Sequence, residues 1–307
     1  MSCLRPIMMY DTGRVNPVTG KRILSAKVSS YATNVAGIPV PCGKCPACLE
    51  SRRNEWCKRL MLEATSHAVN SFCTLTYDDI HLPSDRKANK SHIQLFVKRF
   101  RHAQRDYNVP DFDNFAYFIA SEYGSKFGRP HYHGIMFGVD LLDTAWKPNL
   151  VSLKDGRYPI LTSRVLSDIW SLGFVTVDRA SAHTVKYVSK YITKQGSWSL
   201  KSIGLGARHF LDKRGRSFVG LKPFGRDTIL NGSITLEGAY HTFYTQRMPK
   251  FLLPYVERFD RTLYDAVKAR SRDYLLSSPL PNLSALAKEL SIKCARENKE
   301  RKLDNDS

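Results

Sequence analysis

Apolar positions in the middle of the chain follow two different periods. Residues 71–77 and 115–122 are rich in β-branched and aromatic side chains, which is typical of strands. Between them, residues 92–107 carry apolar side chains at helical spacing, namely Ile93, Phe96, Val97 and Phe100. Ser91 is a suitable N-cap for this helix. We therefore expect a strand, a helix and a second strand, in that order.

The pattern continues with another strand, a short helix, a further strand and a last helix. These four elements are predicted at residues 129–138, 163–171, 173–178 and 182–194, and residues 139–161 are predicted to form a loop. Thr162 or Ser163 caps the short helix, Gly173 ends it, and Ser181 caps the last helix. The order β-α-β-β-α-β-α predicts an α+β fold, in which helices sandwich an antiparallel β-sheet.

Three segments are predicted along the chain. Residues 1–70 hold a cysteine cluster and a helix, and residues 71–195 hold the α+β core. Residues 196–307 form a basic extension with two helices, near 255–270 and 283–297. The highly charged C-terminal tail, from about residue 296, is expected to be disordered because it lacks apolar side chains to bury.

Composition adds a partner to this picture. The chain has 307 residues, which is enough for a full hydrophobic core, and a formal net charge of +19. A globular protein this basic usually binds a polyanion, most often nucleic acid. The chain also has 15 tyrosines, 15 phenylalanines and four tryptophans. Cations for phosphates, together with aromatic rings for unpaired bases, favour a single-stranded nucleic acid as the ligand.

The same composition gives no sign of a membrane protein. No apolar run reaches the roughly 18 residues that a transmembrane helix requires, and the first ten residues lack the apolar region of a signal peptide. We expect a cytoplasmic protein, whose thiols stay reduced and are available to bind metal.

Three cysteines share the C-x2-C-x2-C spacing of thiolate metal ligands: Cys42, Cys45 and Cys48. A structural Zn²⁺ site needs a fourth ligand. Cys57 lies on a helix predicted over residues 49–68, roughly 13 Å beyond Cys48 at the helical rise. We therefore prefer Cys3, ahead of His67. Three free thiols and an iron–sulfur cluster remain as alternatives.

Two histidines flank Tyr132 on the strand predicted at 129–138. Side chains on a strand alternate, so His131 and His133 point to the same side of the sheet. Two imidazoles and a carboxylate make a facial site for a divalent cation. Glu122, near the end of the preceding strand, falls opposite the start of the histidine strand in a hairpin and is the expected third ligand. The triplet alone is equally compatible with a solvated surface.

The last helix of the core presents a possible nucleophile. Tyr187 and Tyr191 are four residues apart, so they lie about 40° apart around the helix axis and one turn along it. Lys190 flanks the same face. A tyrosinate can attack phosphorus, and the ammonium group can stabilise the negative charge that develops. The alternative is that both tyrosines only pack against the sheet.

These residues occur in the order of the three motifs of HUH-type rolling-circle replication initiators. The motifs are the strand at 72–77, the His131-Tyr132-His133 triplet and the Tyr187-x-x-Lys190-Tyr191 helix. The chain most resembles the replication initiators of small circular single-stranded DNA phages, the Microviridae of the gokushovirus kind. The Tyr-Val-Ser-Lys-Tyr block, Cys3 and the cysteine cluster are part of that resemblance, which covers about residues 1–195.

The resemblance implies an HUH endonuclease fold and a metal-dependent endonuclease and strand transferase specific for the phage origin. His131, His133 and Glu122 would bind Mg²⁺ or Mn²⁺. A motif tyrosine would form a 5′-phosphotyrosine and free a 3′-OH that primes synthesis, and the second tyrosine would later cut the regenerated origin and release a circle. The expected partners are viral origin DNA and a host polymerase and helicase, in the cytoplasm of a bacterium. No phosphate-binding loop of an ATPase occurs, which argues against a fused helicase.

Two other functions fit the same residues. A non-catalytic, zinc-containing nucleic-acid-binding protein would use the histidines to contact bases or phosphates. A metal nuclease that activates water would keep the tyrosines as structural residues. A relaxase or transposase would share the chemistry of the initiators, but the cysteine cluster favours replication.

Overall fold

The computed structural model describes residues 3–18, 22–27, 37–110, 115–124, 128–154, 158–194, 196–207, 233–237, 243–247 and 249–277. These residues fall into two compact units, which meet in the chain between Arg52 and Arg53. The predicted segment bounds at residues 70 and 195 stay predictions. No helix in the described part of the chain is long and apolar enough to cross a membrane.

The first unit contains a small antiparallel sheet. Its strands are β1 (Ile7–Val15), β2 (Arg22–Ser25) and β3 (Ile38–Val40), in the order β2-β1-β3. The sequence did not predict these strands, because their apolar side chains are largely exposed and follow no alternation. Asp11 ties β1 to β2, since its carboxylate accepts a hydrogen bond of 2.6 Å from Arg22.

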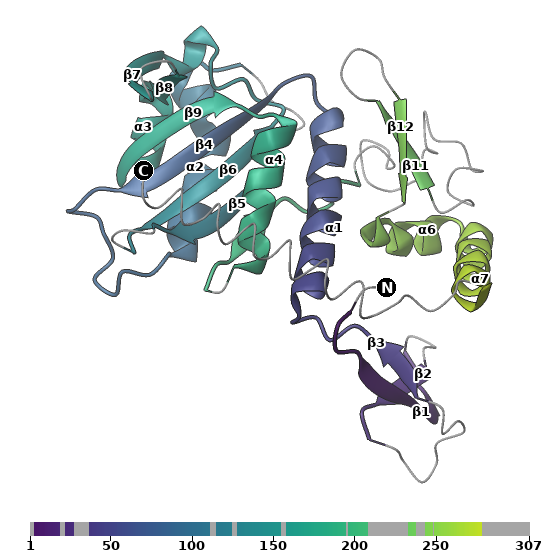
Figure 1. The fold of residues 1–307 in the computed structure, drawn as a ribbon. Helices are drawn as coiled ribbons and strands as arrows, with labels where there is room; N and C mark the ends of the chain where they lie inside the picture. The colour runs from purple at the N-terminus through teal and green to yellow at the C-terminus, as the bar shows by residue number, and fades with distance from the viewer. Residues whose placement is uncertain are drawn as a thin grey trace. The chain divides into compact units, whose positions relative to one another are not determined.

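The second unit is built on a seven-stranded sheet (Figure 1). Its strands are β4 (Asn70–Tyr77), β5 (Ala116–Tyr123), β6 (Pro130–Phe137), β7 (Pro148–Lys154), β8 (Tyr158–Ser163), β9 (Gly173–Arg179) and β10 (Ser199–Lys201). The strand order is β10-β5-β6-β4-β9-β8-β7, and all neighbours run antiparallel. The predicted α+β class with an antiparallel sheet is therefore confirmed.

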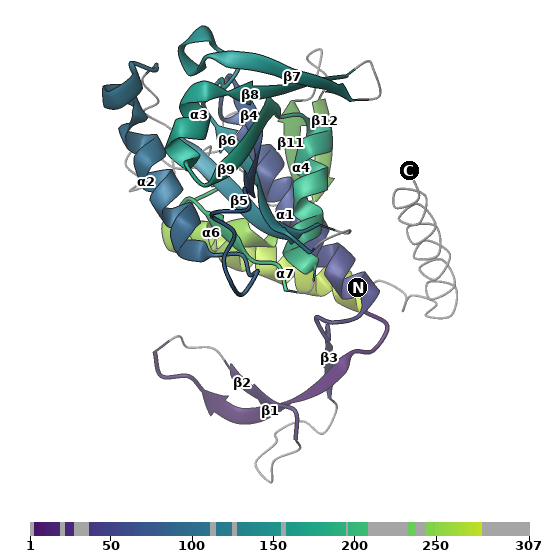
Figure 2. The same cartoon turned by 90° about the vertical axis from the view of Figure 1, so that its left-hand side faces the viewer.

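Helices cover both faces of this sheet, as Figure 2 shows. The helices α2 (Lys90–Tyr107) and α3 (Arg164–Trp170) pack on one face. Side chains of α1 (Pro46–Thr65) and α4 (Ala182–Ser189) pack on the other. The side chains of β4 alternate between the two layers, which places Cys73, Leu75 and Tyr77 in the α2 layer.

The predicted helices of this unit form, with small changes at their ends. Asn89, rather than Ser91, caps α2, and its side-chain oxygen accepts a hydrogen bond of 2.9 Å from the Ser91 N–H. Ser163 caps α3, and Ser181 forms a capping box with Thr184 at α4. The last helix stops being α-helical at Ser189 and continues as the 3₁₀ helix η2 (Lys190–Thr193).

The prediction of a loop over residues 139–161 was wrong. This region holds the 3₁₀ helix η1 (Thr144–Trp146), strand β7 and part of β8. All residues of β7 after Pro148 are exposed, so backbone pairing with β8 holds the strand without an apolar alternation in its sequence. After α3, Gly173 has a φ of +143° and lies so close to the Asp78 backbone that no side chain fits.

The remaining described elements follow β10. They are the hairpin β11 (Ser233–Glu237) and β12 (Phe243–Arg247), the 3₁₀ helix η5 (Lys250–Leu252), α6 (Leu253–Phe259) and α7 (Arg261–Ser277). The helix predicted near 255–270 is thus two helices that meet at Asp260. The predicted helix at 283–297 and the charged tail lie outside the described residues.

Candidate active site

Strand register brings the three predicted metal ligands together. In the β5–β6 pair, Glu122 lies opposite His131, and Ala120 lies opposite His133. Paired residues of antiparallel strands point to the same side, so Glu122 and both histidines share one face of the sheet. This is the face that α4 covers. The hairpin predicted from the sequence therefore forms with Glu122 at the predicted place.

The ligand atoms of these side chains converge. His133 Nε2 lies 2.8 Å from Glu122 Oε2, and His131 Nε2 lies 3.4 Å from the same oxygen. Each histidine uses its other nitrogen elsewhere: His131 Nδ1 lies 3.1 Å from the Arg129 carbonyl oxygen, and His133 Nδ1 lies 3.1 Å from Thr74 Oγ1. These outer hydrogen bonds orient both rings so that Nε2 faces Glu122, as in histidine metal sites. The three residues fit a divalent cation.

Both predicted tyrosines lie against this cluster. The Tyr191 ring stacks on His133 with 5.1 Å between ring centroids, and the Tyr187 ring meets His133 edge-on at 5.4 Å. The two tyrosine rings are themselves 5.2 Å apart. The Tyr191 hydroxyl donates a hydrogen bond to the Glu122 carboxylate and shares one with Tyr187. One carboxylate therefore connects the histidine pair to the tyrosine pair.

A lysine contacts this carboxylate, and it is Lys194 rather than Lys190. Lys194 Nζ lies 3.0 Å from Glu122 Oε1 and 5.6 Å from the centroid of the Tyr191 ring. Lys190 is exposed, and no ion pair or hydrogen bond of its side chain is seen with the described residues. The catalytic role that the sequence predicts for Lys190 stays a prediction.

Burial and hydrogen bonds shift the pKa of several groups here. Burial alone would raise the pKa of Glu122, but hydrogen bonds from both histidines, Tyr191 and Lys194 outweigh it and hold that pKa well below its usual range. Burial, the Glu122 carboxylate and Tyr187 raise the pKa of Tyr191 far above 10. Burial also lowers the pKa of His133, which favours the neutral imidazole that a metal ligand needs.

A second candidate metal site lies in the first unit. The sulfur atoms of the four predicted ligands, Cys3, Cys42, Cys45 and Cys48, lie within 4.8 Å of one another. Sγ of Cys3 is 3.9 Å from that of Cys45, and Sγ of Cys42 is 4.0 Å from that of Cys48. A tetrahedral site with Zn–S bonds of about 2.3 Å separates its sulfurs by roughly 3.8 Å, so these residues fit Zn²⁺.

The cysteine cluster is also prepared to ionise. Burial raises the pKa of Cys45, but hydrogen bonds from the backbone N–H groups of Leu4 and Cys48 and from neighbouring thiols lower it overall, to about 6. Backbone N–H groups likewise lower the pKa of Cys42. Burial raises the pKa of Cys48 to about 12. At neutral pH a thiolate is thus already present among the four sulfurs.

Sequence reasoning missed the residues that support the predicted ligands. Thr74 and Lys194 were taken as ordinary members of a strand and a helix, and their contacts depend on register and on the change from α4 to η2. The Arg129 carbonyl was missed because a backbone acceptor leaves no trace in a side-chain motif. Phe72, whose ring stacks on His133 at 5.8 Å, had a usable signal, since the strand alternation puts it on the histidine face.

Comparison with known proteins places this site within a matched region. Residues 70–196 match the family model of the replication-associated protein ORF2. Replication-associated protein ORF2 of Spiroplasma virus 4 is 29% identical over 239 residues, which cover 71% of this chain and 72% of that protein. No solved structure matches the chain significantly.

Two further relatives come from bacteriophages. Replication-associated protein ORF4 of Chlamydia phage 1 is 36% identical over 164 residues, covering 51% of this chain and 38% of that protein. Replication-associated protein VP4 of Bdellovibrio phage phiMH2K is 30% identical over 196 residues, covering 64% of this chain and 58% of that protein. The chain thus spans less than two thirds of the length of these two relatives. The resemblance predicted from the sequence is confirmed: this chain resembles the replication-associated proteins of Microviridae-type phages, and its residues 70–196 match the family of the replication-associated protein ORF2.

Proposed function

We propose that this protein is a replication initiator that nicks and rejoins DNA at a phage origin through a tyrosine nucleophile. The observation that carries the proposal is the meeting of two groups at one carboxylate. Glu122 Oε2 lies 2.8 Å from His133 Nε2, and the same carboxylate accepts a hydrogen bond from Tyr191. A cation site and a phenol are the two parts that phosphoryl transfer to tyrosine requires.

In this proposal His131, His133 and Glu122 hold Mg²⁺ or Mn²⁺. The cation would polarise the scissile phosphate and favour the ionised phenol beside it. The fit of these residues rests on their donor set and on the outer hydrogen bonds from Thr74 and Arg129. The antiparallel sheet with both histidines on an interior strand, β6, supports an HUH endonuclease fold.

The tyrosines supply the nucleophiles. The phenolic oxygen forms a bond to phosphorus, the bond from phosphorus to the 3′ oxygen breaks, and the proton of the phenol ends on that 3′ oxygen. The products are a 5′-phosphotyrosine and a free 3′-OH, which can prime synthesis. Tyr187 and Tyr191 are 5.2 Å apart, so one can hold the DNA while the other attacks the regenerated origin. The reverse transfer then closes a circle without ATP, because the phosphotyrosine bond keeps the energy.

An exposed aromatic ring beside the site supports a single-stranded DNA substrate. Phe174 pairs with Thr76, Thr76 pairs with His131, and all three lie on one face of the sheet. Phe174 is 67% exposed, although it belongs to a strand of the main sheet. Two strand spacings separate it from His131 by roughly 10 Å. An unpaired base next to the scissile phosphate can stack on this ring.

The first unit contributes a structural Zn²⁺ site in this proposal, with Cys3, Cys42, Cys45 and Cys48 as ligands. The names of the phage relatives support replication as the setting. Viral origin DNA, a host polymerase and a host helicase are the proposed partners, and the cytoplasm of a bacterial host is the proposed location.

The test uses the purified protein, Mn²⁺ and a labelled single-stranded oligonucleotide that spans the candidate origin. We expect a protein band that carries covalently attached DNA on a denaturing gel. The variant Tyr187→Phe/Tyr191→Phe should bind the DNA and form no attached band. Cleaved DNA without attachment would instead assign a water-dependent nuclease. Tight binding without either product, across all segments of the origin region, would leave a non-catalytic nucleic-acid-binding protein.

A further inference from the structure

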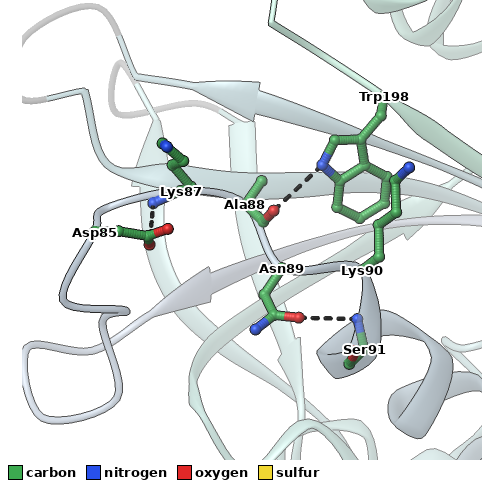
Figure 3. A pocket seen from close by; sticks show the side chains of 7 residues that line it. All are labelled: Asp85, Lys87, Ala88, Asn89, Lys90, Ser91 and Trp198. Atoms are coloured by element: carbon green, nitrogen blue, oxygen red, sulfur yellow. Dashed lines mark hydrogen bonds between the residues drawn. The ribbon is translucent and has the colours of Figure 1, made fainter.

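An open pocket of about 360 Å³ lies where the chain enters α2. Figure 3 shows its lining, which consists of Trp198 and of residues 85 and 87–91. Trp198 precedes β10, the edge strand beside β5. The pocket shares no residue with the candidate active site, and nothing in the proposed chemistry uses it.

The pocket combines a fixed aromatic ring with ammonium groups. Trp198 Nε1 donates a hydrogen bond of 3.3 Å to the Ala88 carbonyl, which fixes the orientation of the indole. Lys90 Nζ lies 5.7 Å from the indole centroid, and the exposed Lys87 lines the same pocket. A flat π-surface beside two cations is the combination that binds a nucleotide, since the base can stack and the phosphate can meet an ammonium group.

Hydrogen bonds attach one wall of the pocket to the strands of the active site. The Ala88 N–H donates to the Tyr123 hydroxyl at 3.1 Å, and the Asn89 N–H donates to the Tyr132 hydroxyl at 2.7 Å. Tyr123 follows Glu122 in β5, and Tyr132 lies between the two histidines of β6. Residues next to the candidate metal ligands, on the opposite face of the sheet, thus support the pocket.

The other wall is attached in the same way. The Trp198 N–H donates to Ser121 Oγ at 2.9 Å, and the Ser121 N–H donates to the Trp198 carbonyl at 2.9 Å. Ser121 is fully buried and directly precedes Glu122. Both walls therefore hold fixed positions relative to the strand end that carries the candidate active site.

The connection between Lys194 and Trp198 limits the distance from site to pocket. Lys194 contacts Glu122 on the α4 face, and Trp198 lines the pocket on the α2 face. Four peptide units join these residues, so their Cα atoms are at most about 14 Å apart. The protein chain itself passes the edge of the sheet over this span, and a single strand of DNA can pass it beside the chain.

We propose that this pocket is a subsite for one unpaired nucleotide of the DNA strand whose phosphate lies at the candidate active site. The base stacks on Trp198, and Lys90 and Lys87 contact the flanking phosphate. The proposal rests on the proposed function, because it takes the substrate strand as its ligand. It adds a second holding point for that strand, on the opposite face of the sheet from Phe174.

The test measures binding in EDTA, so that no cleavage is needed. The probe is a 15-nucleotide oligothymidine with one 5-iododeoxyuridine, a base that cross-links to a stacked aromatic ring under ultraviolet light. We expect a cross-link to Trp198, located by mass spectrometry. The variant Trp198→Ala should bind about tenfold more weakly, whereas Trp198→Phe should stay within about threefold of wild type because it keeps a stacking ring.

Charge variants guard against misfolding of Trp198→Ala. Lys87→Ala/Lys90→Ala leaves the indole in place and should weaken binding about tenfold at low salt. The matched control is Lys98→Ala, an exposed lysine of the same helix that lies roughly 12 Å further along its axis. It should weaken binding by no more than about threefold. Equal losses in the pocket variant and in a control that also carries a second exposed substitution, Lys98→Ala/Arg105→Ala, would overturn the proposal.

The outcomes separate this proposal from the proposed function. Cross-linking at Trp198 without any covalent attachment in Mn²⁺ would support the subsite and refute the nicking reaction. Covalent attachment with no cross-link at Trp198, and with unchanged binding by Trp198→Ala, would refute the subsite alone. Protection of Trp198 from cross-linking by millimolar thymidine 5′-monophosphate, with oligonucleotide affinity unchanged, would assign the pocket to a free nucleotide and overturn the strand subsite.

Discussion

Lys194 Nζ lies 3.0 Å from Glu122 Oε1, while Glu122 Oε2 faces both histidines. The two oxygens of one carboxylate therefore hold different partners. The ammonium group partly neutralises the carboxylate on which a divalent cation would also depend. Lys194 thus balances two effects, since it competes with the cation for charge and offers a positive group to the substrate phosphate.

This relationship predicts opposite changes in two measurements. Lys194→Gln should tighten Mn²⁺ binding about two- to fivefold, because an exposed ion pair of this kind contributes up to about 1 kcal/mol. The same variant should slow covalent attachment to DNA, because a cation beside the phosphate is lost. Calorimetric titration with Mn²⁺ and the rate of adduct formation measure the two effects.

Lys190→Gln is the matched control for this prediction. Lys190 is four residues away and exposed, and its side chain makes no polar contact with the site among the described residues. It should leave Mn²⁺ affinity unchanged. If Lys190→Gln slows attachment and Lys194→Gln does not, the role of the lysine belongs to the motif position predicted from the sequence.

Thr74 should act through His133. Its hydroxyl lies 3.1 Å from His133 Nδ1, and loss of such an outer partner typically weakens metal binding about 10- to 100-fold. We expect this loss for Thr74→Val and recovery to near wild-type affinity in Thr74→Ser. Thr76→Val changes the neighbouring threonine of the same strand face and should bind Mn²⁺ normally. Equal affinities of the two valine variants would contradict this role.

The buried imidazole predicts that acid weakens the fold. Burial lowers the pKa of His133 in the native state, whereas in the unfolded chain the ring titrates near about 6.5. The native state therefore binds this proton less readily, and the contribution of His133 to the free energy of unfolding is complete above about pH 6.5 and falls below it. Urea unfolding of metal-free protein between about pH 7.5 and 5 should show the fall.

The variant His133→Gln should flatten this dependence, because its side chain has no proton to gain. His102→Gln replaces an exposed histidine on α2 and should keep the wild-type slope. A wild-type slope in His133→Gln would show that other groups carry the effect.

The cysteine cluster predicts one tightly bound Zn²⁺ per chain. Cys3→Ser should release it, because three thiolates and a serine bind Zn²⁺ far more weakly than four thiolates. Cys57→Ser is the control, since burial raises the pKa of that thiol and it lies outside the cluster. Metal analysis of the purified variants gives the answer, and retention of zinc by Cys3→Ser would exclude Cys3 as a ligand.

Much of the site could be predicted because its residues sit on regular elements. The spacing of two on β6 puts His131 and His133 on one face, and a short hairpin puts Glu122 opposite them. Spacing along the chain likewise left Cys3 as the preferred partner of the cysteine cluster, and the four sulfurs do lie together. Periodicity alone is enough for such local relationships.

The remaining features depend on contacts between distant segments. The strands β1, β2 and β7 are held by backbone pairing with exposed side chains, so apolar alternation did not mark them. Lys194 reaches Glu122 only because the last helix changes to a 3₁₀ turn after Ser189, which a regular helical projection does not include. Trp198 lines a pocket with residues from a distant part of the chain, 85 and 87–91.

The central claim is that Tyr187 or Tyr191 becomes covalently linked to DNA, and one digestion tests it directly. Trypsin cuts after Lys186, Lys190 and Lys194, so the two tyrosines fall in different peptides, residues 187–190 and 191–194. The adduct formed with an origin oligonucleotide and Mn²⁺ should be digested with trypsin and nuclease, then analysed by mass spectrometry. The account predicts a nucleotide on one or both of these peptides. A nucleotide on any other peptide, or complete cleavage of the DNA with both peptides unmodified, would contradict it.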